Sequence, residues 1–223
     1  MRKLTYFIAV TADGYIARDD GSLDCFPMTG EHLPYIANEY PETIPGHLRA
    51  ALGVRGDNRH FDSVLMGRRT YEVGSVIGFT SPYPHLRQYV VSISMRTSLD
   101  PEVQLVSHDP VDLVRALKQE DGLGIWLCGG ARLAGALYGE IDELILKINP
   151  IVLGMGMPLF RGASGSTTLA LTDQRTFRWR SRNTPLPGGA IDARPVSGCS
   201  SIVPRRRTSG CTRRPREIVD GRG

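Results

Sequence analysis

The chain has 223 residues, of which 41% are apolar and 22% charged, and its formal net charge is +4 at pH 7. This length supports one domain with a sizeable core, and nothing in the composition requires a second core. No apolar run approaches the ~18 residues of a membrane helix, and Met1 to Lys3 lead into a strand-like segment without a signal-peptide pattern. We therefore expect a cytoplasmic protein that does not bind membranes.

Strands and helices alternate along the first 177 residues. Leu4–Val10 is a mostly apolar run, typical of a buried strand, and an aspartate- and glycine-rich loop at 13–24 ends it. Helical patches between Tyr35 and Ala51 are interrupted by prolines. The elements expected next are a strand at 61–66, a helix start at 67–73, a strand at 88–92, a helix at 109–121, a strand at 125–128, a helix to 138 and a strand at 144–148. The alternation predicts an α/β fold in which helices cover both faces of a mostly parallel sheet, giving three layers.

Two of these strands end in glycine and continue directly into a helix. The first passes through Gly67 into Arg68, and the second, 62 residues later, passes through Gly129 and Gly130. Glycine lets a ligand approach the backbone, and the free N–H groups and dipole of a helix start favour an anion. Two such junctions could hold one diphosphate from two sides. The alternative is that each glycine only permits close packing of helix on sheet.

Arginines at the first junction favour a phosphate ligand. The guanidinium groups of Arg68 and Arg69 would oppose the dipole of the helix that they begin, so a bound phosphate explains them better than the helix does. Ser92 ends the next expected strand, at the edge where parallel sheets gather ligands. It could bond a ribose phosphate, or it could only cap a turn. The pattern predicts a phosphorylated nucleotide.

Cysteine and histidine residues give no metal motif. Four cysteines show no ligand spacing, and we expect free thiols: Cys25, Cys128, Cys199 and Cys211. The five histidines are scattered without a partner at motif spacing. The sequence therefore predicts no metal site and no catalytic histidine.

Four segments, in this order, resemble the dihydrofolate-reductase-like superfamily: residues 7–17, the two glycine junctions, and residues 141–154. The resemblance is closest to the branch that includes the C-terminal reductase domain of the riboflavin-pathway deaminase-reductase, and it covers Leu4 to about Phe177. It implies a dihydrofolate-reductase-like fold with a mixed, mostly parallel sheet, NADP(H) as cofactor and a homodimer. The implied reaction is hydride transfer from NADPH to a C=N or C=O of a small heterocyclic or ribityl-like substrate.

The resemblance also assigns site residues. It places Arg68 and Ser92 at the 2′-phosphate of NADP, and Thr70 near the diphosphate. It places the nicotinamide against the end of the first strand and its loop. The complete set of cofactor-binding candidates is Ala9, Ile16, Ala17, Gly67, Arg68, Arg69, Thr70, Ser92, Gly129, Gly130, Ala131 and Arg132. Thr11 is a candidate substrate contact, and no catalytic residue is assigned.

The C-terminal segment departs from the family pattern. Residues 178–223 hold 11 arginines, no lysine and three acidic residues, a net charge of +8, whereas residues 1–177 carry −4. Such a composition buries too little apolar surface to offset its ordering entropy, so we expect a reductase domain at 1–177 and a disordered tail at 178–223. Members of the family add one more apolar strand here, and we expect that strand to be missing. The composition suits a coding sequence read in a shifted frame; a natural basic extension is the alternative.

Two other functions remain open at this stage. The fold could serve as a nucleotide-binding sensor that binds NADPH without consuming it. The arginine-rich tail could bind nucleic acid, although it lacks interleaved aromatic residues beyond Trp179. We rank nucleic-acid binding last.

Overall fold

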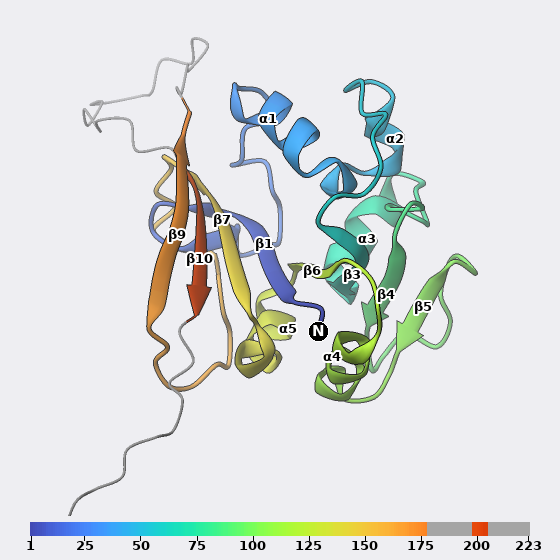
Figure 1. Ribbon diagram of the computed structural model, residues 1–223. Helices are drawn as coiled ribbons and strands as arrows, with labels where there is room; N and C mark the ends of the chain where they lie inside the picture. Colours follow the sequence, from blue (N-terminus) through green and yellow to red (C-terminus); the bar gives the residue numbers. More distant parts are fainter. Residues whose placement is uncertain (178–197, 205–223) are drawn as a thin grey trace, which may run out of the picture.

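The computed structural model describes residues 1–177 and 198–204, and its main feature is an eight-stranded sheet (Figure 1). The strand order is β5-β4-β3-β6-β1-β7-β10-β9. The bounds are β1 (Leu4–Thr11), β3 (Phe61–Gly67), β4 (Arg87–Val91), β5 (Val103–Val106), β6 (Gly124–Gly129), β7 (Glu143–Asn149), β9 (Leu169–Thr176) and β10 (Gly198–Pro204). The strands from β5 to β7 are mutually parallel, and β10 is antiparallel to both of its neighbours. A separate pair joins β2 (Tyr15–Ala17) to β8 (Met157–Pro158).

Helices cover both faces of this sheet. They are α1 (His32–Glu39), α2 (Gly46–Arg49), α3 (Arg68–Val76), α4 (Pro110–Gln119) and α5 (Ala131–Ala136), with 3-10 segments at Pro41–Thr43 and Tyr138–Glu140. On one face, α4 and α5 pack on a core that includes Leu4 and Tyr6 of β1. On the other face, Ile36 of α1 and Tyr71 of α3 pack on a core that includes Phe7. The predicted three-layer α/β/α architecture is confirmed.

Side-chain alternation along the parallel strands sets the two faces. In β1, Tyr6 belongs to the core under α4 and α5, whereas Phe7 belongs to the core under α1 and α3. Both faces are buried, which explains why these strands read as continuous apolar runs. The expected start of α4 also forms, because Asp109 caps the helix by accepting a hydrogen bond from the Val111 N–H at 2.9 Å.

The expectation of a missing last strand is wrong. Residues 198–204 form β10, which lies between β7 and β9, with Ser201 opposite Ile145 of β7 and Asp173 of β9. An inserted strand is held by main-chain hydrogen bonds on both sides, so it can form without an alternating apolar sequence. The shifted-frame hypothesis loses the part of its support that came from this strand. The expected disorder of residues 178–197 and 205–223 lies outside the described residues.

Candidate functional site

The two glycine junctions lie side by side, because β3 and β6 are neighbours and both end at the same edge of the sheet. A Cβ built on Gly130 would lie 3.8 Å from the Gly67 Cα, and one built on Gly67 would lie 3.7 Å from the Gly129 carbonyl oxygen. The Thr70 hydroxyl oxygen would lie 3.6 Å from a Cβ on Gly129 and 3.8 Å from one on Gly130. The structure thus brings Gly67, Thr70, Gly129 and Gly130 together in one small surface made largely of backbone.

Different physical reasons explain why glycine occurs at the two junctions. Gly129 and Gly130 have φ angles of +157° and +105°, a backbone that side chains rarely adopt. Gly67 has an ordinary extended conformation, with φ −75°, and a Cβ there would make only an ordinary van der Waals contact. Neither conformation nor packing therefore requires glycine at position 67. Close approach of a ligand to the backbone is the remaining reason.

Arg68 lies beside the turn that follows β4. Its Nη1 donates to the Ser94 hydroxyl at 3.0 Å, and its Nε donates to a Glu72 carboxylate oxygen at 2.6 Å. Ser92 is buried, and its hydroxyl accepts from the N–H of Met95 at 3.1 Å. Arg68 bonds Ser94 rather than Ser92, whose hydroxyl lies 3.4 Å from the Ser94 hydroxyl, and Ser92 shapes the turn, as the alternative interpretation proposed. Ser94 is the serine that contacts the guanidinium, and the sequence analysis missed it.

The remaining cofactor candidates surround this surface. Arg69 and Arg132 are exposed at the second positions of α3 and α5. Ala131 is buried in one cluster with Ile16 and Val10, and this cluster joins the second junction to the loop after β1. Ala17 is buried in β2, next to Ile16. These contacts bring the expected nicotinamide loop to the junction from the other side.

The Thr11 hydroxyl forms hydrogen bonds within the loop that follows β1. It donates to Asp13 Oδ1 at 2.6 Å and accepts from the Tyr15 N–H at 2.9 Å. The other Asp13 oxygen accepts from the N–H groups of Leu153 at 3.0 Å and Gly154 at 2.7 Å. Desolvation opposes ionisation of Asp13, but these hydrogen bonds prevail and lower its pKa. Thr11 and Asp13 therefore join the loop after β1 to the loop after β7. The Thr11 hydroxyl has a partner both as a donor and as an acceptor.

Lys147, which the sequence analysis missed, lies with Cys128 and Tyr83 on the sheet face under α1. Lys147 of β7 is opposite Ala9 in the register with β1, and its Nζ lies 4.5 Å from the centre of the Phe7 ring. Cys128 of β6 belongs to the same face, and its Sγ is 3.9 Å from the Tyr83 hydroxyl. The available signal was a lysine at an inward-facing position of an apolar strand.

The neighbours of Lys147 favour their neutral forms. Burial raises the pKa of the Cys128 thiol to about 11, although the Tyr83 hydrogen bond and the Lys147 charge act in the opposite direction. Burial also raises the pKa of the Tyr83 hydroxyl well above its ordinary value. On α1, burial and then the Lys147 charge lower the pKa of His32. Cys128, Tyr83 and His32 are therefore uncharged near pH 7.

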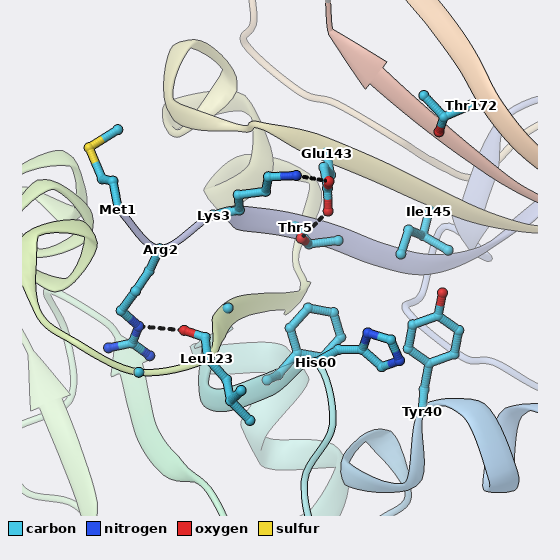
Figure 2. Close-up of a pocket in the computed structure, with 13 residues that line it drawn as sticks. Met1, Arg2, Lys3, Thr5, Tyr40, His60, Leu123, Glu143, Ile145 and Thr172 are labelled. Carbon is cyan, nitrogen blue, oxygen red and sulfur yellow. Dashed lines mark hydrogen bonds and ion pairs between the residues drawn. The ribbon is translucent and has the colours of Figure 1, made fainter.

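A cavity of about 350 Å³ opens on the same sheet face, toward the amino ends of the strands (Figure 2). Thr5 and Ile145 line it, and they precede Phe7 and Lys147 by two positions on β1 and β7. Tyr40 also lines the cavity and stacks on the Phe7 ring with centroids 4.9 Å apart. The cavity therefore lies at the amino ends of the strands, whereas the glycine junctions lie at their carboxyl ends.

Lysine, arginine and threonine side chains that line this cavity are paired within the protein. Figure 2 shows Lys3 donating to Glu143 at 2.5 Å and Arg2 donating to the Leu123 carbonyl at 2.6 Å. Thr5 donates to the same Glu143 carboxylate at 3.2 Å. These pairs lie at the amino ends of the strands, and none of them belongs to the phosphate site that the sequence predicts.

Within the part of the chain that the structure describes, no three His, Cys, Asp or Glu side chains come together in a group that could hold a metal ion. In that same part, none of the helices is long and apolar enough to cross a bilayer.

Sequence comparison matches most of the chain to a known domain family. The family model described as the RibD C-terminal domain matches residues 2–182. The uncharacterized protein YwjB of Bacillus subtilis (strain 168) is 32% identical over 178 residues, which cover 79% of this chain and 92% of YwjB. The uncharacterized protein YyaP of the same organism is 25% identical over 188 residues, which cover 79% of this chain and 89% of YyaP.

Three solved structures share the fold, each matched over 92% of this chain. A protein assigned to riboflavin biosynthesis from Shewanella sp. PV-4 matches over its whole length with a TM-score of 0.61 and 21% identity. The Thermotoga maritima diaminohydroxyphosphoribosylaminopyrimidine deaminase/5-amino-6-(5-phosphoribosylamino)uracil reductase matches over 57% of its length, with a TM-score of 0.57 and 14% identity. Dihydrofolate reductase from Enterococcus faecalis, complexed with NADP(H), matches over 97% of its length, with a TM-score of 0.56 and 14% identity. At these identities the likeness shows a dihydrofolate-reductase-like fold.

Proposed function

Because the chain belongs to the RibD C-terminal domain family, we propose that it is an oxidoreductase that transfers a hydride from NADPH to a C=N or C=O of a small heterocyclic or ribityl-like substrate. The observation that carries the proposal is the meeting of both glycine junctions with Arg68 at one edge of the sheet. Enzymes that use nicotinamide cofactors need such a site, because the protein supplies binding and orientation while the cofactor supplies the hydride.

The residues present fit the chemistry of NADPH. Backbone at Gly67, Gly129 and Gly130 offers close approach to a diphosphate, with the Thr70 hydroxyl beside it. Arg68 and Ser94 offer a charge-assisted site for a 2′-phosphate, since guanidinium groups bind phosphate through several N–H donors. Arg68 pairs with Glu72 in this structure, so binding would exchange one anionic partner for a more highly charged one.

The nicotinamide would lie at the other end of this surface. Ile16 is buried in one cluster with Ala131 of the second junction, Ala17 is buried next to Ile16, and Ala9 lies on β1 between Ile8 and Val10; these side chains are small or apolar. An apolar surround excludes water from the hydride path. The fold shared with an NADP(H)-bound dihydrofolate reductase supports this placement at the level of architecture.

The test is to follow NADPH absorbance in the presence of flavin, pterin and quinone-like acceptors. We expect acceptor-dependent NADPH consumption by the wild-type protein and a lower rate with Arg68→Ala. NADPH binding without consumption by any acceptor would favour a nucleotide sensor. Absence of NADPH binding would contradict the proposal.

A further inference from the structure

We propose that Lys147 is the substrate-binding cation of this reductase and that the substrate is a planar heterocycle carrying negative charge. The inference rests on the proposed function and deepens it, because it assigns the chemistry of the second ligand. It concerns the sheet face under α1, next to the expected nicotinamide position and separate from the glycine junctions.

Strand register places Lys147 beside the expected hydride path. Lys147 is opposite Ala9 on β1, and Ala9 shares its face of the strand with Phe7 and Thr11. The Lys147 Nζ lies 4.5 Å from the Phe7 ring centre, so the cation sits over an aromatic face on the same side of the sheet. The Phe7 ring is itself buried and stacked on Tyr40, so a substrate would meet this ammonium group beside the Phe7 ring rather than on it.

The surrounding side chains select a flat, anionic ligand. Phe177 and Tyr35 lie with ring centroids 5.2 Å apart beside the same core, which offers further stacking surface. Arg175 of β9 lies over the Tyr35 ring at 4.5 Å and adds a second positive charge. Aromatic rings provide stacking, and the cations provide charge recognition.

Other polar groups near Lys147 are poor candidates for the same task. Cys128 and Tyr83 are neutral at physiological pH because burial raises their pKa values. His32 is neutral because burial and the Lys147 charge lower its pKa. The Thr11 hydroxyl already bonds Asp13 and the Tyr15 N–H.

Hydride transfer gives Lys147 a chemical role as well as a binding role. The hydride leaves C4 of the reduced nicotinamide and forms a C–H bond at the substrate carbon, while the C=N or C=O π pair moves to nitrogen or oxygen. NADPH is oxidised to NADP⁺, and the substrate is reduced by two electrons. The Lys147 ammonium stabilises the new negative charge, donates a proton to that atom and regains a proton from water.

Orotate and uracil are suitable probes, because they share a pyrimidine ring and only orotate carries a carboxylate. Each is titrated by calorimetry into the full-length protein, with and without NADP⁺. We expect wild type to bind orotate more tightly than uracil. Lys147→Met should weaken orotate binding by roughly ten- to a hundredfold, the value of a charge-assisted hydrogen bond, while Lys147→Arg should retain most of the affinity. NADPH affinity should be unchanged in both variants.

Equal orotate affinity in wild type and Lys147→Met would overturn the inference, as would equal wild-type affinity for orotate and uracil or no orotate binding at all. Thermal unfolding of both variants checks that they are folded, and Lys147→Arg keeps the test valid if the methionine variant is not. Failure of wild type to bind NADP⁺ would contradict the proposed function instead, and the titration without cofactor would still decide the role of Lys147.

Discussion

Neither the backbone conformation nor the packing at position 67 requires a glycine, so we attribute Gly67 to the close approach of a ligand. Gly67→Ala should change the free energy of unfolding by less than about 0.5 kcal/mol, since the new Cβ would meet only the Gly129 carbonyl at 3.7 Å. NADPH affinity should fall at least roughly tenfold, because the methyl group would occupy the surface that the diphosphate approaches. Thermal unfolding and a fluorescence titration with NADPH measure the two quantities.

Gly135 provides the matched control. A Cβ at this position would lie 2.0 Å from the Arg161 carbonyl oxygen, so Gly135→Ala should force the backbone to shift and destabilise the fold. If Gly67→Ala destabilised the protein as much as Gly135→Ala, the glycine at 67 would be explained by packing, and the argument for a ligand there would fail.

Sequence reasoning found backbone features of the site better than side-chain partners. Gly67 and Gly129 are recognisable because each follows an apolar strand and precedes a helix. Ser94 and Lys147 were missed for a physical reason, since their meaning depends on which strands become neighbours. Ser94 meets Arg68 only because β4 pairs with β3, and Lys147 meets Phe7 only because β7 pairs with β1.

Asp13 joins the loop after β1 to the loop after β7 by hydrogen bonds, and its ionisation makes this attachment sensitive to pH. Its pKa is lowered below the ordinary 3.8, so its ionised form is favoured in the folded protein. The hydrogen bonds from Leu153 and Gly154 to the Asp13 carboxylate are therefore fully present at pH values above the ordinary pKa of Asp13. They are lost as the pH falls through the lower pKa that Asp13 has in the folded protein. At pH values below this lowered pKa, hydrogen exchange at the Leu153 and Gly154 amides should accelerate relative to the intrinsic rate, while core amides of β1 stay protected.

Asp13→Asn separates this effect from general acid unfolding. The asparagine keeps one acceptor oxygen but does not ionise, so protection at Leu153 and Gly154 should be weaker at neutral pH and independent of pH between 2 and about 5. A variant with the same pH dependence as wild type would show that another group controls the loops.

Elements were predictable where a local signal sets them. The parallel strands β1, β3, β4, β6 and β7 read as apolar runs, and α4 begins at its aspartate and proline as expected, whereas the short edge strand β5 was not predicted. The strand β10 was missed because Gly198–Pro204 lacks an alternating apolar pattern, and its conformation depends on the partners that β7 and β9 offer. The two-residue strand β8 was missed because its pairing with β2 has no sequence pattern.

Strand β10 links β7 to β9, so that the eight strands form one continuous sheet. Truncation after Phe177 would leave main-chain groups of both strands without their β10 partners. We expect a lower unfolding temperature and more aggregation than in a control truncated after Pro204, which retains the strand. Thermal unfolding monitored with light scattering compares them, and equal behaviour would show that β10 adds no stability.

The family resemblance implies a homodimer, and the surface after α3 supports that proposal. Val76, Ile77 and Phe79 expose 84%, 61% and 38% of their surface in the single chain, which is unusual for neighbouring apolar residues. We expect the mass of a dimer by light scattering at tens of micromolar and a monomer after Ile77→Asp. A monomeric wild type would reject a stable dimer.

We propose that NADPH binds across both glycine junctions with its 2′-phosphate at Arg68, and titration of NADPH and NADH into wild type and Arg68→Ala measures this contact. Wild type should prefer NADPH by roughly ten- to a hundredfold, because the contact is a charge-assisted hydrogen bond of ~1.5–3 kcal/mol. Arg68→Ala should lose most of that preference and keep its NADH affinity. Equal wild-type affinity for NADPH and NADH, or a preference that survives Arg68→Ala, would contradict the account.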